Sequence, residues 1–410
     1  MKYPVSDIAK YALDNPSSIR EIMSVVTDYR EHPEKYPRKL IYLGGGWPQD
    51  PPPKALIEAA REIVEDELLF NESARYGTTR GQPPFIRGLI KYEREVFNRK
   101  VFPNEILIGS GSTDLIGATI IACINPGDEV IVTRPAYLNY IRQLQVEMKL
   151  NVGIKAWNLI KNYEFNPSLD ELQNLVSSKT KLMILTSPGN PDSQVISDEI
   201  LSGIVDIAED KGFWVMIDVA YRAFFYNSPP RYISRDRREN EVWMCTLSKE
   251  MRIPGWRLAY LIGDPSLIRA IEVIEQARVL CPNRFVQEVM TRVFLDEDRL
   301  KEVKEYYEIQ RKLYSKIALY TYEKLKSNID GLKILKPEAG FYVFFNHEEY
   351  EHSSKKVCND LLKKWQVALA PGVDFLMDGW TRLSFAPCVL NPEVIDEGVD
   401  RMKNYFQGLK

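Results

Sequence analysis

A lysine, two hydroxyl residues and an arginine lie close together near residue 250. Thr246 and Ser248 come just before Lys249, and Arg257 follows the lysine by eight positions, beyond a Pro-Gly bend. Apolar runs flank this segment, where unpaired charges are costly, so a functional site is favoured over a surface turn. An amine that can form an imine, with hydroxyl groups and a guanidinium for a phosphate dianion, suits a phosphate-bearing aldehyde.

A carboxylate and a tyrosine follow the most apolar run of the chain. Asp218 ends the run FWVMID, and Tyr221 comes three residues later. Asp218 could pair with a protonated pyridine nitrogen and keep the ring electron-accepting, while Tyr221 could reach a phenolic oxygen on that ring. A carboxylate in this position can equally cap the next helix, so both interpretations stay open.

Three weaker motifs fit the same chemistry. Ser112 and Thr113 lie between a predicted strand and an apolar helix, where backbone N–H groups can hold a phosphate. Asn190 follows a buried strand and could donate a hydrogen bond to a ring oxygen, although Asn-Pro is also an ordinary turn. Tyr137 could stack on a flat ring, or it could pack in the core.

Four further side chains are candidates for substrate contacts. Arg382 lies inside an apolar strand, which calls for an anionic partner, either a structural carboxylate or a substrate carboxylate. Arg278 and Arg284 could read a second carboxylate, or they could be helix surface charges. Trp47 and the many tyrosines would allow an aromatic substrate.

The elements that must position these residues alternate between short apolar runs and amphipathic stretches. This pattern predicts an α/β fold, with a mainly parallel sheet covered by helices on both faces. Ligands of such sheets bind at the carboxyl ends of the strands. The predicted strands are residues 106–109, 129–133, 181–187, 213–218, 242–247 and 258–263.

The order of the predicted elements changes after about residue 290. A long charged helix leads into two strands, a helix near 354–365, a strand pair and a closing helix, which predicts a smaller α+β domain. We therefore expect three parts: an N-terminal segment, 1–50, near the small domain and the active site, a large domain, 51–290, and a small C-terminal domain, 291–410.

Composition excludes several classes of protein. The formal net charge of −3 argues against nucleic-acid and membrane binding, and no apolar run is long enough to span a bilayer. Five scattered cysteines without a C-x-x-C pair argue against a disulfide framework or zinc site, and with the absence of a secretory signal they suit the cytoplasm. The three histidines, His32, His347 and His352, lie in charged, turn-like contexts, and we expect all three at the surface, without a metal.

The order of these motifs resembles the class I/II aminotransferases of pyridoxal 5'-phosphate (PLP) fold type I. The resemblance runs from about residue 17 to 408, and its most specific element is the lysine signature S-K-x(5)-G-x-R-x-G, which departs only at Ala259. SSIREIM, LGGGWP and VALAPG look closest to the 2-aminoadipate/kynurenine aminotransferase branch. The lysine-to-arginine spacing is more typical of the aspartate/aromatic branch.

The resemblance implies a role for each site residue. Lys249 would form the Schiff base and then move the proton, with Asp218 on the ring nitrogen and Tyr221 and Asn190 on the ring oxygen. Arg382, the backbone at Gly46 and Asn190 would bind the substrate. The other PLP-binding residues would be Tyr137, which stacks on the ring, and the phosphate ligands Ser112, Thr113, Thr246, Ser248, Arg257 and, from the neighbouring subunit, Tyr76.

The segment SPGNPDSQ departs from the family pattern N-x-x-N-P-T-G. Ser187 replaces the first Asn, and Asp192 and Ser193 replace Thr-Gly, so the conformation of this loop is open although Asn190 and Pro191 are kept. The sequence predicts an aminotransferase that moves the amino group of an aromatic, dicarboxylic or aminoadipate-like L-amino acid to a 2-oxo acid such as 2-oxoglutarate, as a homodimer with shared active sites. A PLP-dependent lyase or decarboxylase, and a non-catalytic protein on the same fold, are the alternatives.

Overall fold

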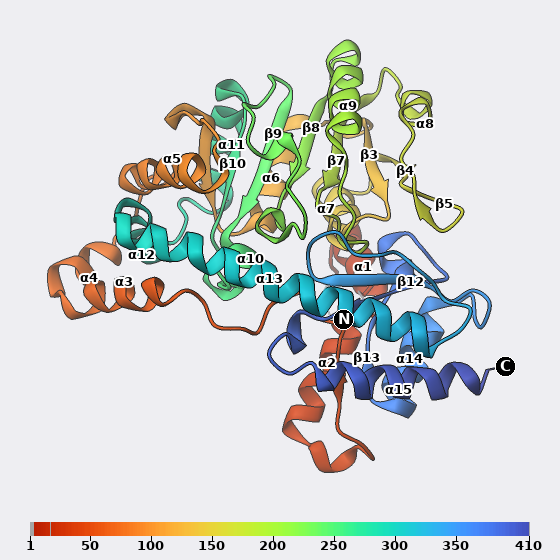
Figure 1. The fold of residues 1–410 in the computed structure, drawn as a ribbon. Helices are drawn as coiled ribbons and strands as arrows, with labels where there is room; N and C mark the ends of the chain where they lie inside the picture. Colours follow the sequence, from red (N-terminus) through yellow and green to blue (C-terminus); the bar gives the residue numbers. More distant parts are fainter. Residues whose placement is uncertain (1–3, 17, 410) are drawn as a thin grey trace.

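A seven-stranded mixed sheet forms the centre of the computed structural model, which describes residues 4–16 and 18–409 (Figure 1). The strand order is β2-β10-β9-β8-β7-β3-β4. Neighbouring strands are parallel from β4 to β9, whereas β10 runs antiparallel to both β9 and β2. The strands are β2 (Ile106–Gly109), β3 (Glu129–Arg134), β4 (Gly153–Asn158), β7 (Thr180–Thr186), β8 (Trp214–Asp218), β9 (Glu241–Thr246) and β10 (Ala259–Ile262).

Both faces of this sheet are covered by helices, which confirms the predicted α/β architecture. Side chains alternate between the faces, as Ile106 and Ile108 pack in one hydrophobic cluster and Leu107 in the other. The helices on the first face are α5 (Pro83–Phe97), α8 (Leu169–Leu175), α9 (Asp198–Lys211) and α12 (Arg284–Leu295). Those on the second face are α6 (Ser112–Cys123), α7 (Leu138–Glu147) and α11 (Pro265–Arg278).

All six predicted strands are present, with boundaries that shift by no more than one residue. The edge strand β4 was not predicted, because its burial is only partial and its sequence, GIKAWN, has no continuous apolar run. The carboxyl ends of β3, β7, β8 and β9 lie along one edge of the sheet, since these strands are parallel.

The C-terminal part surrounds a second, four-stranded sheet of order β11-β12-β15-β14. The long helix α13 (Glu297–Asn328) runs from the large sheet to this part (Figure 1). It packs with the cluster on the first face of the sheet and with a separate hydrophobic cluster in the C-terminal part. The other elements of the C-terminal part are β11 (Lys333–Ile334), β12 (Tyr342–Asn346), α14 (Ser354–Trp365), β13 (Val367–Ala368), β14 (Ala370–Pro371), β15 (Trp380–Ser384) and α15 (Glu393–Gln407).

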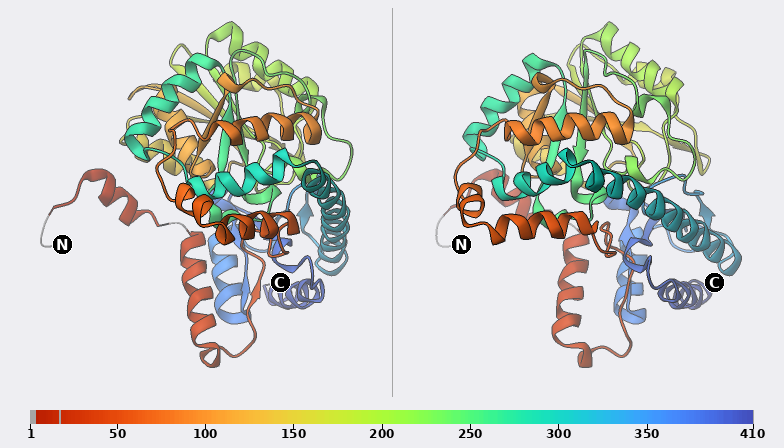
Figure 2. Two further views of the ribbon diagram at one scale, coloured as in Figure 1. Left: turned by 90° about the vertical axis from the view of Figure 1, so that its left-hand side faces the viewer. Right: turned by 60° about the vertical axis from the view of Figure 1, so that its left-hand side comes forward.

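The N-terminal segment joins this C-terminal part. Strand β1 (Ile41–Tyr42) pairs in parallel with β13, and α2 (Ser18–Glu31) lies beside α14 (Figure 2). The division of the chain into an N-terminal segment, a large domain and a small domain, with boundaries at residues 50 and 290, stays a prediction. The remaining elements are α1 (Asp7–Asp14), α3 (Lys54–Glu65), α4 (Glu67–Ser73), β5 (Ile160–Lys161), β6 (Glu164–Phe165) and α10 (Leu247–Glu250).

The expectation of three surface histidines is wrong for His347. Its side chain is fully buried, with Nε2 3.0 Å from Thr381 Oγ1 and Nδ1 2.7 Å from the Glu351 carbonyl oxygen. Burial lowers the pKa of His347. The charged neighbours in the sequence gave no sign of this, because they point outward from the turn that carries the buried ring.

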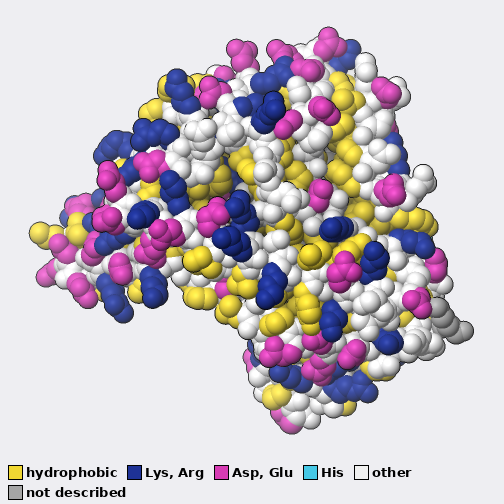
Figure 3. All heavy atoms as spheres, in the orientation of Figure 1, with side chains coloured by type: hydrophobic (Ala, Val, Ile, Leu, Met, Phe, Trp, Pro, Cys, Tyr) yellow, Lys and Arg dark blue, Asp and Glu magenta, His cyan; other side chains and the backbone are white. Residues whose placement is uncertain are grey.

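Surface charges of both signs are interspersed over the face shown in Figure 3. Within the described residues, no group of His, Cys, Asp and Glu side chains could hold a metal ion. No helix in that same part of the chain is long and apolar enough to cross a membrane.

Candidate active site

A cavity of about 380 Å³ opens where the carboxyl ends of the parallel strands meet the N-terminal segment and β15. Nearly every residue singled out from the sequence lines it, although these residues come from positions far apart in the chain. The predicted residues along its wall are Gly46, Ser112, Thr113, Tyr137, Asn190, Asp218, Tyr221, Thr246, Ser248, Lys249, Arg257 and Arg382.

Lys249 lies on α10, a single helical turn that begins directly after β9. The hydroxyl of Thr246 caps this turn by accepting a hydrogen bond from the Ser248 N–H at 3.2 Å. The Lys249 ammonium donates to the Gly46 carbonyl oxygen at 2.8 Å. Burial and the nearby guanidinium groups of Arg382 and Arg257 lower the pKa of Lys249 to about 8.

Asp218 ends β8 with its carboxylate directed into the cavity. One oxygen accepts from the Tyr140 hydroxyl at 2.7 Å and the other from the Ala220 N–H at 3.0 Å. The side chain is buried, and burial raises its pKa. Since both of these donors are neutral, a cationic N–H in the cavity would stabilise the ionised carboxylate.

A hydrogen-bonded chain connects Asn190, Tyr221 and Arg382. The Asn190 amide donates to the Tyr221 hydroxyl at 3.3 Å, and the Asn190 oxygen accepts from Arg382 Nη1 at 2.8 Å. Tyr342 extends the chain, with its hydroxyl 2.6 Å from that of Tyr221. Four donors or acceptors therefore meet at one side of the cavity.

Arg382 is buried without a carboxylate partner among the described residues. Its Nη2 donates to the Gly44 carbonyl oxygen at 2.8 Å, and its Nε is buried without a hydrogen bond to any described group. The guanidinium carbon lies 4.4 Å from the centroid of the Tyr342 ring. Burying a guanidinium that lacks a counter-ion is costly, so the arrangement is suited to an anionic ligand.

The opposite end of the cavity is built for a phosphate. Helix α6 begins at Ser112, so its free N–H groups point into the site. Gly111 has φ +95°, and a Cβ there would lie 2.3 Å from Arg257 Nη2, so a side chain at this position would displace the guanidinium. Thr246 and Ser248 add hydroxyl groups, with their oxygens 3.0 Å apart.

The loop after β7 accommodates its departures from the family pattern through internal hydrogen bonds. Ser187 Oγ accepts from the Ile196 N–H at 3.0 Å, and buried Asp192 accepts from the Gln194 N–H at 3.1 Å. Ser193, at φ 57°, accepts from the Tyr342 N–H at 3.1 Å. These contacts stabilise the loop while Asn190 still faces the cavity.

Three candidates lie outside the cavity wall of this chain. Tyr76 follows α4 and is 83% exposed. Arg278 pairs with Glu147 at 3.2 Å, and Arg284 pairs with Glu72 at 3.1 Å. Within the described residues, both arginines therefore form ion pairs outside the cavity. This favours the alternative interpretation, in which they are surface charges of helices.

Sequence reasoning missed several side chains of the cavity wall. Tyr140 and Tyr342 hydrogen-bond to predicted site residues, as described above, and Thr186 hydrogen-bonds to Tyr140 at 2.7 Å. Arg20 of α2 and Arg142 of α7 add two cations. The only sequence signal was weak: Tyr140 and Arg142 follow the candidate Tyr137 by three and five residues, on the helix that begins directly after it.

These features fit PLP on physical grounds. The cavity has a phosphate cradle that a Cβ at Gly111 would fill, a buried carboxylate at Asp218, and a lysine whose amine has a depressed pKa. The orphaned Nε of Arg382 adds a place for a substrate carboxylate.

Comparisons with known proteins agree with this chemistry. The family model described as aminotransferase class I and II matches residues 38–402. An aspartate aminotransferase of Thermotoga maritima is 28% identical over 369 residues, covering 90% of this chain and 91% of the relative. Aromatic-amino-acid aminotransferase 2 of Thermococcus litoralis is 25% identical, with 97% of each chain covered.

The fold is also found among solved structures. A single mutant of Thermus thermophilus aspartate aminotransferase superposes with a TM-score of 0.86 at 22% identity, covering 98% of this chain and 99% of that one. This likeness confirms the predicted fold class.

Proposed function

The chain belongs to the class I and II aminotransferases, and from this premise we propose how its own residues carry out PLP-dependent amino-group transfer and which substrates they select. Bound in the cavity, PLP supplies an electrophilic aldehyde and an electron-accepting pyridinium ring. Lys249 serves as the amine that attaches the cofactor and then as the acid and base for the substrate α-proton. The pKa of about 8 supports this role, since it leaves part of the amine neutral near pH 7.

The other side chains hold the ring and the phosphate. Asp218 pairs with the ring nitrogen, and Tyr221 and Asn190 donate hydrogen bonds to the ring oxygen. Tyr137 stacks on the ring face. The phosphate ligands are Ser112, Thr113, Thr246, Ser248 and Arg257, together with Tyr76 of a second subunit.

The distribution of cations supports a substrate with two carboxylates. Five cationic side chains line the cavity, and Asp218 is the only acidic one among the described residues of its wall. Arg257 serves the phosphate and Arg382 the α-carboxylate. Arg20 and Arg142 remain, and neither forms an ion pair with a described residue, so they are available for a second carboxylate. Relatives named as aspartate aminotransferases support the same class.

We therefore propose L-aspartate, L-glutamate or L-2-aminoadipate as amino donor and 2-oxoglutarate as acceptor. The test is a panel of amino donors with wild type, Arg142→Met and Arg20→Met. Loss of a charged contact worth roughly 1.5–3 kcal/mol lowers kcat/KM for dicarboxylic donors by about 10- to 100-fold. The same substitutions should leave kcat/KM for phenylalanine nearly unchanged.

Arg278→Met is the matched control, because this arginine lies outside the cavity and pairs with Glu147. If Arg142→Met and Arg20→Met lower kcat/KM equally for phenylalanine and aspartate, these arginines do not bind a second carboxylate of the substrate. A wild-type preference for tyrosine or phenylalanine would instead favour an aromatic substrate held by Trp47, which also lines the cavity. Release of ammonia without any acceptor would favour a lyase.

We also propose a homodimer that works in the cytoplasm. Large apolar side chains are exposed on α4 and the loop after it, with Leu68 at 77% and Tyr76 at 83% exposure. Pairing this region with a second copy would bury these side chains and bring Tyr76 to the partner's phosphate site. The five cysteines are free thiols, which suits a reducing compartment.

A further inference from the structure

The residues that directly follow Tyr221 and Lys249 form a buried ion pair with each other. Arg222 Nε lies 2.7 Å from Glu250 Oε1, and both side chains are at most 1% exposed. Neither residue lines the active-site cavity. The ion pair therefore connects the segment that carries Tyr221, after β8, with the segment that carries Lys249, after β9. It does so outside the cavity wall.

Further groups complete this buried cluster. Glu93 of α5 accepts from Arg222 Nη1 at 3.1 Å and from Nη2 at 2.7 Å. The Tyr260 hydroxyl accepts from Nη2 at 2.6 Å, and the Tyr92 hydroxyl donates to Glu250 Oε2 at 2.6 Å. The guanidinium is thus held by partners from α10, α5 and β10 at once, which fixes its orientation.

The charges of the cluster argue for a role beyond stability. Burying ions is costly, and apolar side chains of similar volume serve stability equally well or better. Burial raises the pKa of Glu93, but the Arg222 and Arg99 guanidinium groups outweigh burial and the net shift is downward. A buried charged network with several directional hydrogen bonds therefore lies directly beside Tyr221 and Lys249.

We propose that Arg222 is a positioning residue, which through Glu250 and Glu93 sets the orientation of Tyr221 relative to Lys249. This inference rests on the proposed roles of those two residues at the cofactor. A displacement of about 1 Å at either residue costs roughly 100-fold in rate, because proton transfer and ring contacts depend on alignment. Arg382, the proposed ligand of the substrate α-carboxylate, donates its hydrogen bonds to Asn190 and Gly44, which lie outside this cluster.

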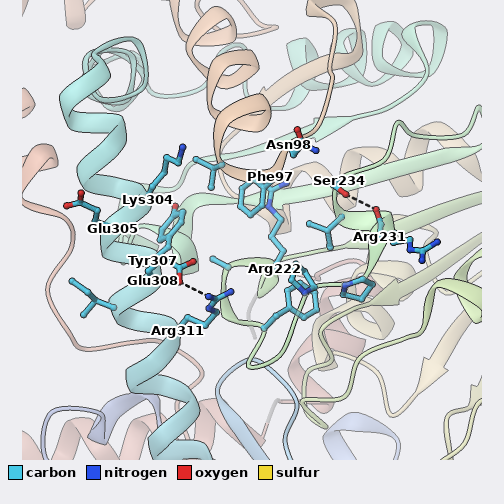
Figure 4. Close-up of a pocket in the computed structure, with 17 residues that line it drawn as sticks. Phe97, Asn98, Arg222, Arg231, Ser234, Lys304, Glu305, Tyr307, Glu308 and Arg311 are labelled. Atoms are coloured by element: carbon cyan, nitrogen blue, oxygen red, sulfur yellow. Dashed lines mark hydrogen bonds and ion pairs between the residues drawn. The ribbon is translucent and has the colours of Figure 1, made fainter.

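A second cavity, of about 880 Å³, lies beside Arg222 and offers space for a small cation from solution. Arg222 lines it, and the guanidinium carbon lies 3.7 Å from the centroid of the Phe97 ring (Figure 4). Tyr307 and Ile233 form part of the same wall. Shortening Arg222 would join the volume of its guanidinium to this cavity, so a small planar cation from solution could take its place.

The first experiment compares wild type with Arg222→Ala, with and without added guanidinium at about 10–50 mM. We expect kcat to fall about 10- to 100-fold in the variant, while KM for the amino donor stays within about twofold. Guanidinium restores kcat by about 10-fold, because it can pair with Glu93 and Glu250 in a planar fork, whereas methylammonium does not. The absorbance band of bound PLP and the PLP dissociation constant are measured in parallel and follow the same rescue.

Glu250→Gln is the second test variant, for use if Arg222→Ala does not fold. It keeps the shape of the side chain and leaves Glu93 to neutralise Arg222. It should lower kcat with little change in KM and shift the PLP band. Arg237→Met is the control variant, since Arg237 forms a partly shielded pair with Glu105 at 2.9 Å, with the two side chains 12% and 13% exposed, away from both cavities. That variant should lose stability without the kcat loss.

The outcomes separate this inference from the proposed function. A wild-type protein that binds no PLP would contradict the proposed function itself. Wild-type PLP binding with undiminished kcat in Arg222→Ala or Glu250→Gln would overturn the positioning role. Equal kcat losses in Arg237→Met, or rescue by methylammonium as well as by guanidinium, would also overturn it.

Discussion

The chemistry of Lys249 is set by its surroundings rather than by its side chain alone. Burial disfavours the ammonium form, and the charges of Arg382 and Arg257 add to this effect, while Asp218 opposes it. The pKa therefore lies at about 8, below the ordinary 10.5 of a lysine. A neutral amine is available at Lys249 at a pH where other lysines are almost fully protonated.

This shift predicts how cofactor capture depends on pH. Only the neutral amine attacks an aldehyde, so the rate at which cofactor-free protein captures pyridoxal should rise about 10-fold per pH unit and level off above pH about 8. Stopped-flow absorbance measures this rate. Arg382→Gln removes a neighbouring positive charge and should move the midpoint upward. A wild-type midpoint near 10.5 would contradict the environment described here.

Sequence reasoning worked for residues whose types are unusual in their setting. Lys249, Arg257 and Arg382 are charged residues between apolar runs, and all three line the cavity. Tyr140 and Tyr342 were not foreseen, because buried tyrosines near strands usually pack in the core and their hydrogen bonds depend on tertiary contacts. The roles of the residues along the wall stay predictions until they are tested.

At the scale of elements, the start of α6 combines two requirements. Gly111 has a positive φ, and its missing Cβ leaves room for Arg257. Helix α6 then presents its N–H groups to the same place. The Gly-Ser turn was a weak sequence motif, because only the position of Arg257 across the site explains why glycine is needed.

Gly111→Ala should therefore weaken PLP binding by about 10-fold or more, since the new Cβ displaces a phosphate ligand worth roughly 1.5–3 kcal/mol. Gly212→Ala is a matched control: Gly212 has φ +71°, but no atom lies within 4 Å of a Cβ there. Both variants carry a backbone cost of about 1–2 kcal/mol, seen as a lower Tm. Equal PLP affinities in the two variants, measured by fluorescence titration, would argue against the cradle.

The six predicted strands of the large sheet could be recognised because they are short and mostly buried apolar runs. Strand β4 was not, because an edge strand is only partly buried and lacks that signal. The loop after β7 could not be predicted in detail either. Its conformation depends on hydrogen bonds such as that of Ser193 with the distant Tyr342.

At the scale of the whole molecule, the arm formed by α3 and α4 projects from the large sheet (Figures 1 and 2). Leu68 and Phe70 are exposed on α4, at 77% and 47%. Exposed apolar side chains close together on a projecting arm are typical of a subunit interface. Such an interface would place Tyr76 near the phosphate site of the second subunit.

Charging this arm should prevent the proposed dimer from forming. A Leu68→Lys/Phe70→Lys double variant is expected to run as a monomer in size-exclusion chromatography with light scattering, and to bind PLP more weakly because the partner's tyrosine is lost. Leu390→Lys is the control, since Leu390 is 66% exposed but lies in the C-terminal part. A double variant that stays dimeric with unchanged PLP affinity would place the interface elsewhere.

Reduction with borohydride tests whether Lys249 carries PLP. The wild-type protein is incubated with PLP, reduced and digested, and the peptides are analysed by mass spectrometry. We expect a phosphopyridoxyl group on the peptide that contains Lys249, and in Lys249→Ala no peptide labelled to an equivalent level. Labelling of another lysine in the wild-type protein, or no labelled peptide at all, would contradict it.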